Sequence, residues 1–321
     1  MIYWSLILLV SFIIPIIALP FFIKYQKKHN IGQKIRQEGP DLHQHKMGTP
    51  TMGGVIIILV LGIIILFLIP YQKYVLWSLV ATVGFGFIGL IDDLIKFINK
   101  RSLGLLTMQK FSLQIVFALI VAYFIQQNTD LGTEIYLPFI KNNLDLGIMF
   151  VPFVVLVMVS AVNAVNLSDG LDGLATGLII IAMLSFAFIA YIQNILPMSL
   201  FTLIVGFTSF GFLIYNFYPA RIFLGDVGSL ALGGALASAA IFTRTELILV
   251  IIGGVFAIET LSVILQIISV KLRGKIMFKM SPIHHHFELC GWKEPKIIIR
   301  FWITGCIFAL IGIASLLPSL T

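Results

Sequence analysis

Residues 174–192 read LATGLIIIAMLSFAFIAYI, a run of nineteen residues without a charged side chain. A helix rises about 1.5 Å per residue, so a run of this length can cross the hydrocarbon core of a bilayer. Similar runs of seventeen or more residues recur along the chain, and only one of them contains a charge, Glu259. The ten runs are 1–23, 53–70, 74–91, 111–127, 146–165, 174–192, 195–217, 227–243, 247–270 and 301–321. We therefore predict an all-α polytopic membrane protein with ten transmembrane helices.

The composition of the whole chain supports this fold class. Of the 321 residues, 59% are hydrophobic and 11% are charged, and the mean hydropathy is +1.05. Soluble domains carry about 25% charged residues, so the composition excludes a soluble globular enzyme and a disordered chain. The formal net charge is +7, but in a membrane protein the positions of the charges matter more than their sum. We predict one integral membrane domain, residues 1–321, that binds membrane lipid and no nucleic acid.

The basic residues lie mostly in alternate loops. If the nine predicted loops alternate across the membrane, only Lys73, Lys141 and Arg244 fall on one side, and the other 18 of the 21 basic residues fall on the opposite side. Lysine and arginine are enriched in cytoplasmic loops. The distribution therefore predicts that loops 24–52, 92–110, 166–173, 218–226 and 271–300 are cytoplasmic and that both termini lie outside.

The remaining segments suggest little further structure. The one long outer loop, 128–145, contains TEIYL at 133–137, which favours a strand, and we expect a short hairpin there. The first run lacks the basic start and the cleavage site of a signal peptide, so we expect a retained helix. Two cysteines, Cys290 and Cys306, are too few for a disulfide framework.

Side chains that could carry chemistry gather on the predicted cytoplasmic side. This side holds all six histidines, and five aspartates, at positions 92, 93, 169, 172 and 226, fall there at helix ends. A secondary transporter places its ionisable groups near the middle of the membrane, where this chain has only Glu259. The layout favours an enzyme with its active site at the cytoplasmic face, where a lipid and a water-soluble substrate can meet.

The third run ends at Ile91, the first residue of the motif IDDLIK at 91–96. On a continuing helix, Asp92 and Lys96 are four residues apart and share one face. Two adjacent carboxylates beside a lysine suit a divalent cation and a phosphate. A local ion pair at a helix end would have the same sequence, so both interpretations stay open.

The fifth run is followed by a series of polar residues. Asn163, Asn166, Asp169 and Asp172 are spaced three residues apart, which places them on one stripe if the segment is helical. Polar groups at the end of an apolar span are costly without partners. The stripe is therefore either a ligand site or a network of capping and interhelical hydrogen bonds.

The motif GDVGS, residues 225–229, leads into the eighth run and is expected to open its helix. Asp226 is either a helix N-cap or a carboxylate that holds a Mg²⁺ ion bridging phosphates. Phe223, just before it, either stacks on a base or anchors the chain at the membrane interface.

Three further features have less specific sequences. In PIHHHFE, residues 282–288, consecutive side chains point apart, so we expect His284–His286 to contact phosphate or hold the loop rather than bind zinc. The segment GTPTMGG, 48–54, precedes a helix whose N–H groups could bind an anion, or it belongs to a basic segment on anionic lipid. Glu259 shares a helix face with Ser262 and Gln266, and it either makes an interhelical hydrogen bond or lines a substrate groove.

Five motifs together resemble those of the phospho-N-acetylmuramoyl-pentapeptide-transferase family. They lie in the same order between residues 35 and 289: IRQEGP with KMGTPTMGG, IDDLIK, NAVNLSDGLDGLATG, YNFYPARIFLGDVGS and SPIHHHFEL. The related polyprenyl-phosphate N-acetylhexosamine-1-phosphate transferases share the DD- and GD-type motifs but differ in the first loop and in the histidine loop. GTPTMGG and HHHFE therefore favour the muramoyl-pentapeptide family.

The resemblance implies a reaction. Phospho-MurNAc-pentapeptide would move from UDP-MurNAc-pentapeptide to undecaprenyl phosphate, giving lipid I and UMP in the first membrane step of peptidoglycan synthesis. It also implies Mg²⁺ as the cofactor, a homodimer, and a place in the bacterial cell membrane. Two alternatives stay open: a related polyprenyl-phosphate GlcNAc-1-phosphate transferase and, in another class, a lipid-linked transporter or flippase.

The resemblance also implies roles for single residues. The implied catalytic residues are Asp92, Asp93, Asp226 and His285, with Asp226 and Asp93 at the metal and Asp92 at the lipid phosphate. The implied substrate-binding residues are Lys46, Lys96, Lys110, Asn163, Asn166, Asp169, Asp172, Asn216, Phe223, Gly225, Ser229, Gln266 and His284. Direct attack by the lipid phosphate and a covalent aspartyl-phosphate route both remain open.

Overall fold

The computed structural model describes residues 2–29, 31–32, 46–68, 72–99, 101, 103–138, 140 and 142–316. Within these residues, nine helices are long and apolar enough to span a membrane. They are α1 (Ile2–Lys28), α3 (Lys73–Ile98), α4 (Thr107–Asn128), α5 (Phe150–Ser168), α6 (Leu174–Ile192), α7 (Leu196–Asn216), α8 (Gly225–Phe242), α10 (Gly254–Arg273) and α12 (Glu294–Leu316). An apolar but shorter helix, α2 (Gly54–Leu68), lies in the second predicted run. The all-α polytopic fold is confirmed, while the count of ten spans and the orientation of the termini stay predictions.

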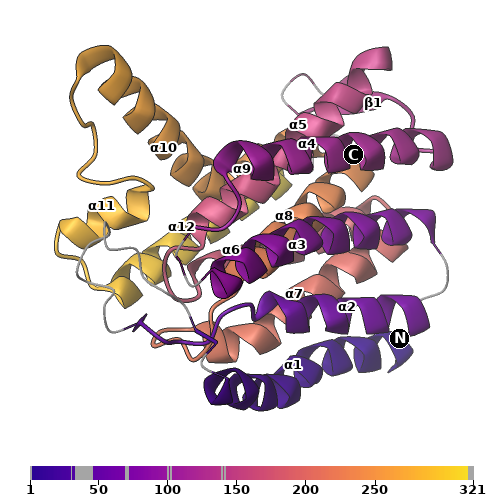
Figure 1. The fold of residues 1–321 in the computed structure, drawn as a ribbon. Helices are drawn as coiled ribbons and strands as arrows, with labels where there is room; N and C mark the ends of the chain where they lie inside the picture. The colour runs from indigo at the N-terminus through magenta and orange to yellow at the C-terminus, as the bar shows by residue number, and fades with distance from the viewer. Residues whose placement is uncertain are drawn as a thin grey trace.

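The helices form a bundle around α8 (Figure 1). Every residue of α8 from Val227 to Phe242 is buried, and the helix contacts α2, α3, α5, α6, α7 and α9 (Glu246–Ile252). Its sequence explains this position, because glycine, alanine and serine let neighbouring helices approach closely. At Gly89 of α3, an added Cβ would lie 2.2 Å from the backbone oxygen of Asp226. This close approach brings the end of α3 against the start of α8.

The ninth predicted run is not one continuous helix. The structure divides it into the short helix α9 and the longer α10, which meet at Gly253. Two consecutive glycines favour the break because glycine is a poor helix former, and the ring of Phe308 packs directly against Gly254. After the break, α10 leaves the bundle and projects away from it (Figure 1). The predicted run 247–270 is therefore not one continuous helix, and the part of it that is long enough to span a membrane is α10.

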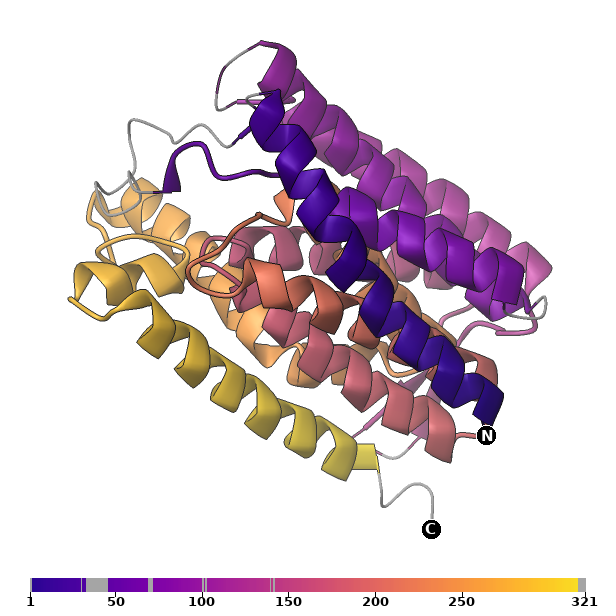
Figure 2. The same ribbon diagram turned by 90° about the horizontal axis from the view of Figure 1, so that it is seen from below.

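The two ends of the bundle differ. At one end lies the predicted hairpin, β1 (Glu134–Leu137) and β2 (Asn142–Asp145), which pair antiparallel with Ile135 opposite Leu144. It is followed by the 3₁₀ helix η2 (Gly147–Met149). The start of α1 and the end of α12 lie at one end of the bundle, and the short helix α11 (Ile283–Leu289) lies at the other (Figure 2).

Candidate active site

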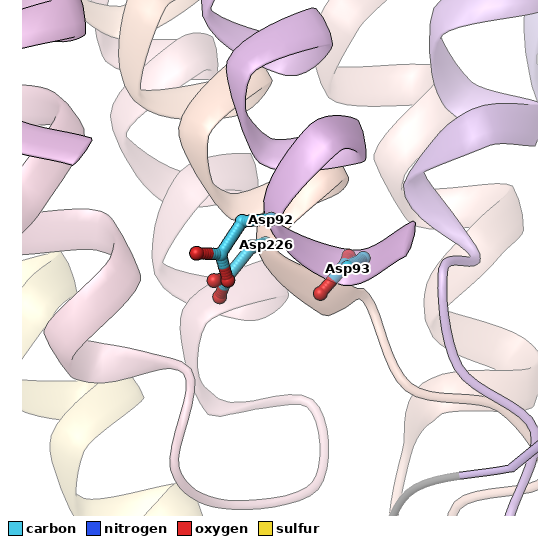
Figure 3. A group of neighbouring side chains, drawn as sticks. All are labelled: Asp92, Asp93 and Asp226. Atoms are coloured by element: carbon cyan, nitrogen blue, oxygen red, sulfur yellow. The ribbon is translucent and has the colours of Figure 1, made fainter. Parts of the chain in front are cut away.

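Three aspartates from two helices meet near one end of the bundle. Asp92 and Asp93 lie in the last two turns of α3, and Asp226 lies in the first turn of α8. One oxygen of each carboxylate lies within 4.8 Å of the other two. Figure 3 shows Asp92 and Asp226 side by side, with Asp93 set further away. Asp92 and Asp93 are buried and Asp226 is half-buried, and we call these three residues the aspartate cluster.

Two lysines face the aspartate cluster. The Lys96 Nζ lies 2.6 Å from Asp92 Oδ2, 2.7 Å from Asp226 Oδ2 and 3.3 Å from Asp93 Oδ1. The Lys110 Nζ lies 2.8 Å from the same Asp226 oxygen. Asp92 and Lys96 therefore share one helix face, as predicted. If all three carboxylates are ionised, the two ammonium groups leave one negative charge uncompensated.

Backbone groups hold the two carboxylates of α3 in place. The Leu105 N–H donates to Asp92 Oδ1 over 2.8 Å, and the Val227 N–H donates to Asp93 Oδ2 over 3.1 Å. These donors sit on the segment before α4 and in the first turn of α8. Each carboxylate is therefore oriented by an element other than its own helix.

Asn166 fixes the remaining oxygen of Asp226. Its Nδ2 donates to Asp226 Oδ1 and to Ser229 Oγ, each over 2.8 Å. Its Oδ1 lies 3.4 Å from the Lys110 Nζ. This adds α5 to α3, α4 and α8 as the fourth helix of the site, and it brings Asn166, Ser229 and Lys110 together.

The donor set of the aspartate cluster fits a magnesium ion. Carboxylate oxygens are hard ligands, and protein Mg²⁺ sites typically use one or two carboxylates with substrate phosphates and water completing the shell. Asp226 and Asp93, with Asp92 beside them, could supply those carboxylates. Within the described parts of the chain, no other group of three such side chains converges in this way.

A loop far away in the sequence supports the start of α8. Residues 50–54 run beside residues 223–224, with Phe223 N donating to Pro50 O over 2.8 Å and Gly53 N donating to Phe223 O over 2.9 Å. Gly54 N donates to Leu224 O over the same 2.9 Å. The GTPTMGG and FLGD motifs therefore form one structural unit under the aspartate cluster.

Gly225 is required at this junction by both its backbone and its surroundings. Its φ is +75°, and an added Cβ would lie 2.7 Å from Asp93 Oδ2 and 2.9 Å from Met52 N. A side chain at positive φ costs about 1–2 kcal/mol, before any clash is counted. The glycine therefore lets α8 begin against the carboxylate of Asp93.

The Gly225→Ala variant is expected to lose about 100-fold in kcat, because displacements near 1 Å in an active site have effects of that order. The matched control is Gly274→Ala, which has a φ of +64° but no atom within 4 Å of the added Cβ. Both variants have the cost of a side chain at positive φ, so the difference between them in steady-state assays and melting curves reports the contacts of the added methyl group with Asp93 and Met52. Equal activity of the two variants would contradict this explanation.

A second charged cluster lies around Lys46. The Lys46 Nζ is 2.6 Å from Asp172 Oδ1 and 2.6 Å from Glu294 Oε1. The same Glu294 oxygen accepts the Asp172 N–H over 2.7 Å, and Asp172 Oδ2 accepts the Ala220 N–H over 2.9 Å. Lys46 and Asp172 are buried, and the side chain of Glu294 is 8% exposed. We call Lys46, Asp172 and Glu294 the Lys46 cluster.

Glu294 was missing from the predicted site. The predicted last span began at residue 301, because Lys296 and Arg300 interrupt the uncharged run, but α12 begins at Glu294. An acidic residue before an apolar span is a common helix start, and this signal could have placed Glu294 in the first turn of α12. Its partners, far away in the chain, could not be read from the sequence.

Asp169 lies between the two clusters. The helix α5 ends at Ser168 with Asp169 as its C-cap, so the predicted helical stripe does not continue to Asp172. Burial raises the pKa of Asp169 well above its usual range, and the nearby carboxylates of Asp226 and Asp93 raise this pKa further. Asp172 instead lies in the turn between α5 and α6, where it reaches Lys46.

Other predicted substrate residues have partners within the protein. Asn163 lies in α5 about one turn before Asn166, and it donates to Gln114 Oε1 over 2.6 Å. Asn216 is buried and donates to Ile222 O over 3.0 Å, which supports the loop before α8. Phe223 is half-buried in that loop.

The three histidines of α11 contact three different groups. His284 Nδ1 lies 3.0 Å from Glu259 Oε1, within hydrogen-bond distance, and both side chains are completely buried. His285 Nδ1 lies 2.6 Å from Glu288 Oε2, and the Nδ1 of His286 accepts a backbone hydrogen bond. Glu259 thus makes the interhelical hydrogen bond that its position suggested. The 35–40 motif and His43 lie outside the described residues.

The sequence comparisons identify related proteins. Residues 75–244, more than half of the chain, match the sequence model of glycosyl transferase family 4. The phospho-N-acetylmuramoyl-pentapeptide-transferase of Halalkalibacterium halodurans is 47% identical to this chain over 312 residues, which is 96% of each protein. Proteins of the same name from Caldanaerobacter subterraneus and Bacillus subtilis are 46% and 45% identical over at least 95% of each chain. The region matched by the family model includes the whole aspartate cluster.

Proposed function

The chain belongs to the phospho-N-acetylmuramoyl-pentapeptide-transferases of glycosyl transferase family 4, and we propose that the aspartate cluster is its catalytic centre. It is a multi-pass enzyme of the bacterial cell membrane. It transfers phospho-MurNAc-pentapeptide from UDP-MurNAc-pentapeptide to undecaprenyl phosphate, and the products are lipid I and UMP.

The chemistry of the substrates supports this assignment. A phosphate on a lipid must approach the diphosphate of a soluble nucleotide, so both reacting groups are anionic. Transfer of this kind depends mainly on positioning and on electrostatic stabilisation. The observation that carries the proposal is the convergence of three carboxylates and two lysines, Lys96 and Lys110, at one end of a membrane bundle.

Asp226 and Asp93 would hold Mg²⁺, in keeping with the fit of their oxygens to that ion. When bound there, the ion would offset the negative charge of the donor diphosphate. Lys96 and Lys110 lie beside the same carboxylates, and we propose that their ammonium groups contact phosphate oxygens during transfer. His285 would add a further phosphate contact, with its ring held by Glu288.

Asp92 would orient the lipid phosphate and accept its proton. One of its oxygens accepts the Leu105 N–H and the other contacts Lys96, so the carboxylate is fixed in position. A lipid phosphate oxygen would then attack the β-phosphorus of the donor. The bond from that phosphorus to the bridging oxygen breaks, and UMP leaves with the electron pair.

We propose that the Lys46 cluster and the loop before α8 form the nucleotide side of the site. Phe223 would stack on uracil, and Asn216 supports the loop that carries it. Because Lys46 is already bound by two carboxylates, it would shape this side by joining the first loop to the α5–α6 turn and to α12.

An assay of the purified protein in detergent tests the function. We expect UMP release with UDP-MurNAc-pentapeptide only when undecaprenyl phosphate and Mg²⁺ are present, together with a lipid product of the mass of lipid I. Release with UDP-GlcNAc in place of that donor would instead assign the chain to the related hexosamine-phosphate transferases. Reactions without the lipid control for hydrolysis of the donor.

The homodimer implied by the family resemblance stays a prediction. Light scattering of the protein eluting in detergent measures the protein mass independently of the bound detergent. A mass of two chains is expected.

A further inference from the structure

The helix α10 carries a polar stripe on its inner face. Glu259, Ser262 and Ser269 are buried and Gln266 is half-buried, and their spacing of three or four residues places them on one side of the helix. The outer residues are apolar and exposed, for example Leu261 at 53%. Although the first part of α10 also packs against α5, the side chains of Glu259, Gln266 and Ser269 form hydrogen bonds to the segment that follows α10 in the chain.

The C-terminal half of the stripe, Gln266 and Ser269, holds the connection from α10 to α11. Gln266 Oε1 accepts the N–H groups of Met277 and Phe278 over 3.0 and 2.9 Å, and its Nε2 donates to Phe278 O over 3.1 Å. Ser269 Oγ donates to Lys275 O over 2.8 Å. Both the oxygen and the nitrogen of the Gln266 amide therefore form hydrogen bonds with the connection, although the family resemblance implied a substrate contact for this residue.

At the N-terminal end of the stripe, Glu259 holds His284. The two side chains are 0% exposed, and Nδ1 and Oε1 are 3.0 Å apart. An ionisable group inside a membrane-spanning helix is costly and needs a reason. A carboxylate at Nδ1 fixes the tautomer and the orientation of an imidazole, so Glu259 determines where Nε2 points.

The other nitrogen of His284 points at the α5–α6 turn. A Cβ added to Gly170 would lie 2.2 Å from Nε2, so the ring rests directly on the backbone of this glycine. Neither Nε2 nor the second Glu259 oxygen has a hydrogen-bond partner among the described residues. The His284 ring therefore holds the turn by packing against it and not through a hydrogen bond from Nε2. The same turn carries Asp169 and Asp172, one on each side of Gly170.

We propose that Glu259 is a positioning residue for the nucleotide donor. Through His284 it fixes the 169–173 turn, which places Asp172 against Lys46 on the nucleotide side of the site. Glu259 thus connects α10, the helix outside the bundle, to donor binding. This inference rests on the proposed function, because it assumes that the Lys46 cluster serves the donor.

Steady-state kinetics of Glu259 variants test the proposal. Glu259→Leu removes the acceptor for the Nδ1–H, and we expect its donor KM to rise about 10–100-fold, the usual effect of removing a residue that orients a histidine. The KM for undecaprenyl phosphate and the kcat should change much less. Glu259→Gln keeps an oxygen that can accept the same hydrogen bond, so it should restore the donor KM to within a few-fold of the wild type.

A matched control separates positioning from burial. Glu246 is another buried glutamate, directly before the ninth predicted run and at the start of α9, and neither of its carboxylate oxygens has a hydrogen-bond partner among the described residues. Glu246→Leu should leave the donor KM unchanged. Glu259→Leu could instead have an unchanged donor KM together with a lower melting temperature and a smaller active fraction. This result would show that Glu259 has only a structural role, and it would overturn the proposal.

Gly170→Ala tests the same link from the other side and does not depend on whether Glu259→Leu folds. Its methyl group must displace His284, so the donor KM should rise as in Glu259→Leu. Because the two changes break the same link, the donor KM of the double variant should be no higher than that of the more strongly affected single variant. An unchanged donor KM in Gly170→Ala would overturn the proposal. A wild-type protein inactive in this assay would instead contradict the proposed function.

Discussion

Asp226→Asn is expected to reduce kcat for lipid I formation by at least about 1,000-fold, since losing one preorganised electrostatic contact costs about 100- to 1,000-fold and this residue makes several. One Asp226 oxygen contacts Lys96 and Lys110, and the other accepts from Asn166. Asparagine has the same shape but no charge, so the two lysines lose the carboxylate that they share. The proposed metal ligand is lost in the same substitution.

The assay compares purified Asp226→Asn with the wild type at saturating donor, lipid and Mg²⁺. Asp130→Asn is the matched control, because it makes the same chemical change at an exposed position and should keep wild-type activity. Melting curves and elution profiles should agree between the variants and the wild type. Activity of Asp226→Asn within tenfold of the wild type would remove Asp226 from the catalytic centre.

Lys96→Met is expected to lower kcat by about 100- to 1,000-fold, the range seen when one preorganised donor is removed from a developing charge. The Lys96 ammonium is the one group that contacts all three carboxylates of the aspartate cluster in the described structure. Methionine keeps much of the aliphatic length of the side chain, so packing along α3 is largely retained. The loss should therefore appear in the chemical step rather than in folding.

Lys73→Met serves as the control for Lys96→Met. Lys73 begins the same helix at its other end and is exposed, so its replacement should leave kcat unchanged. Single-turnover experiments with preformed enzyme–donor complex measure transfer apart from product release. If Lys96→Met transfers at the wild-type rate in such an experiment, the proposed contact with phosphate is wrong.

The helices were largely predictable from the sequence because a lipid environment requires long uncharged segments. Residues 174–192 form α6 with the predicted bounds. The run 227–243 is among the shorter ones, yet α8 is the most central helix. Its small residues give the run a lower hydropathy, but they let the neighbouring helices pack closely around it. The break at Gly253 escaped prediction, since glycines occur inside many membrane helices and hydropathy alone does not separate a break from a close contact.

The site was predictable in its residue types and only partly in its geometry. Asp92 and Lys96 could be paired because they lie four residues apart on one helix. The contact of Lys110 with Asp226, and that of Lys46 with Glu294, depend on which helices neighbour each other, and no short-range pattern carries that information. The family resemblance assigned roles to many of these positions, but it did not show that Lys46, Gln266 and His284 would be bound by groups of the protein itself.

Binding of Mn²⁺ to the purified protein, followed by electron paramagnetic resonance, tests the central claim most directly. If the aspartate cluster is the catalytic metal centre, the wild type should bind Mn²⁺ at one class of site from which Mg²⁺ displaces it. Asp226→Asn should weaken this binding by at least about tenfold, as the loss of a ligand or its support usually does, while Asp130→Asn should not. Equal Mn²⁺ affinity in the wild type and in Asp226→Asn would contradict the claim.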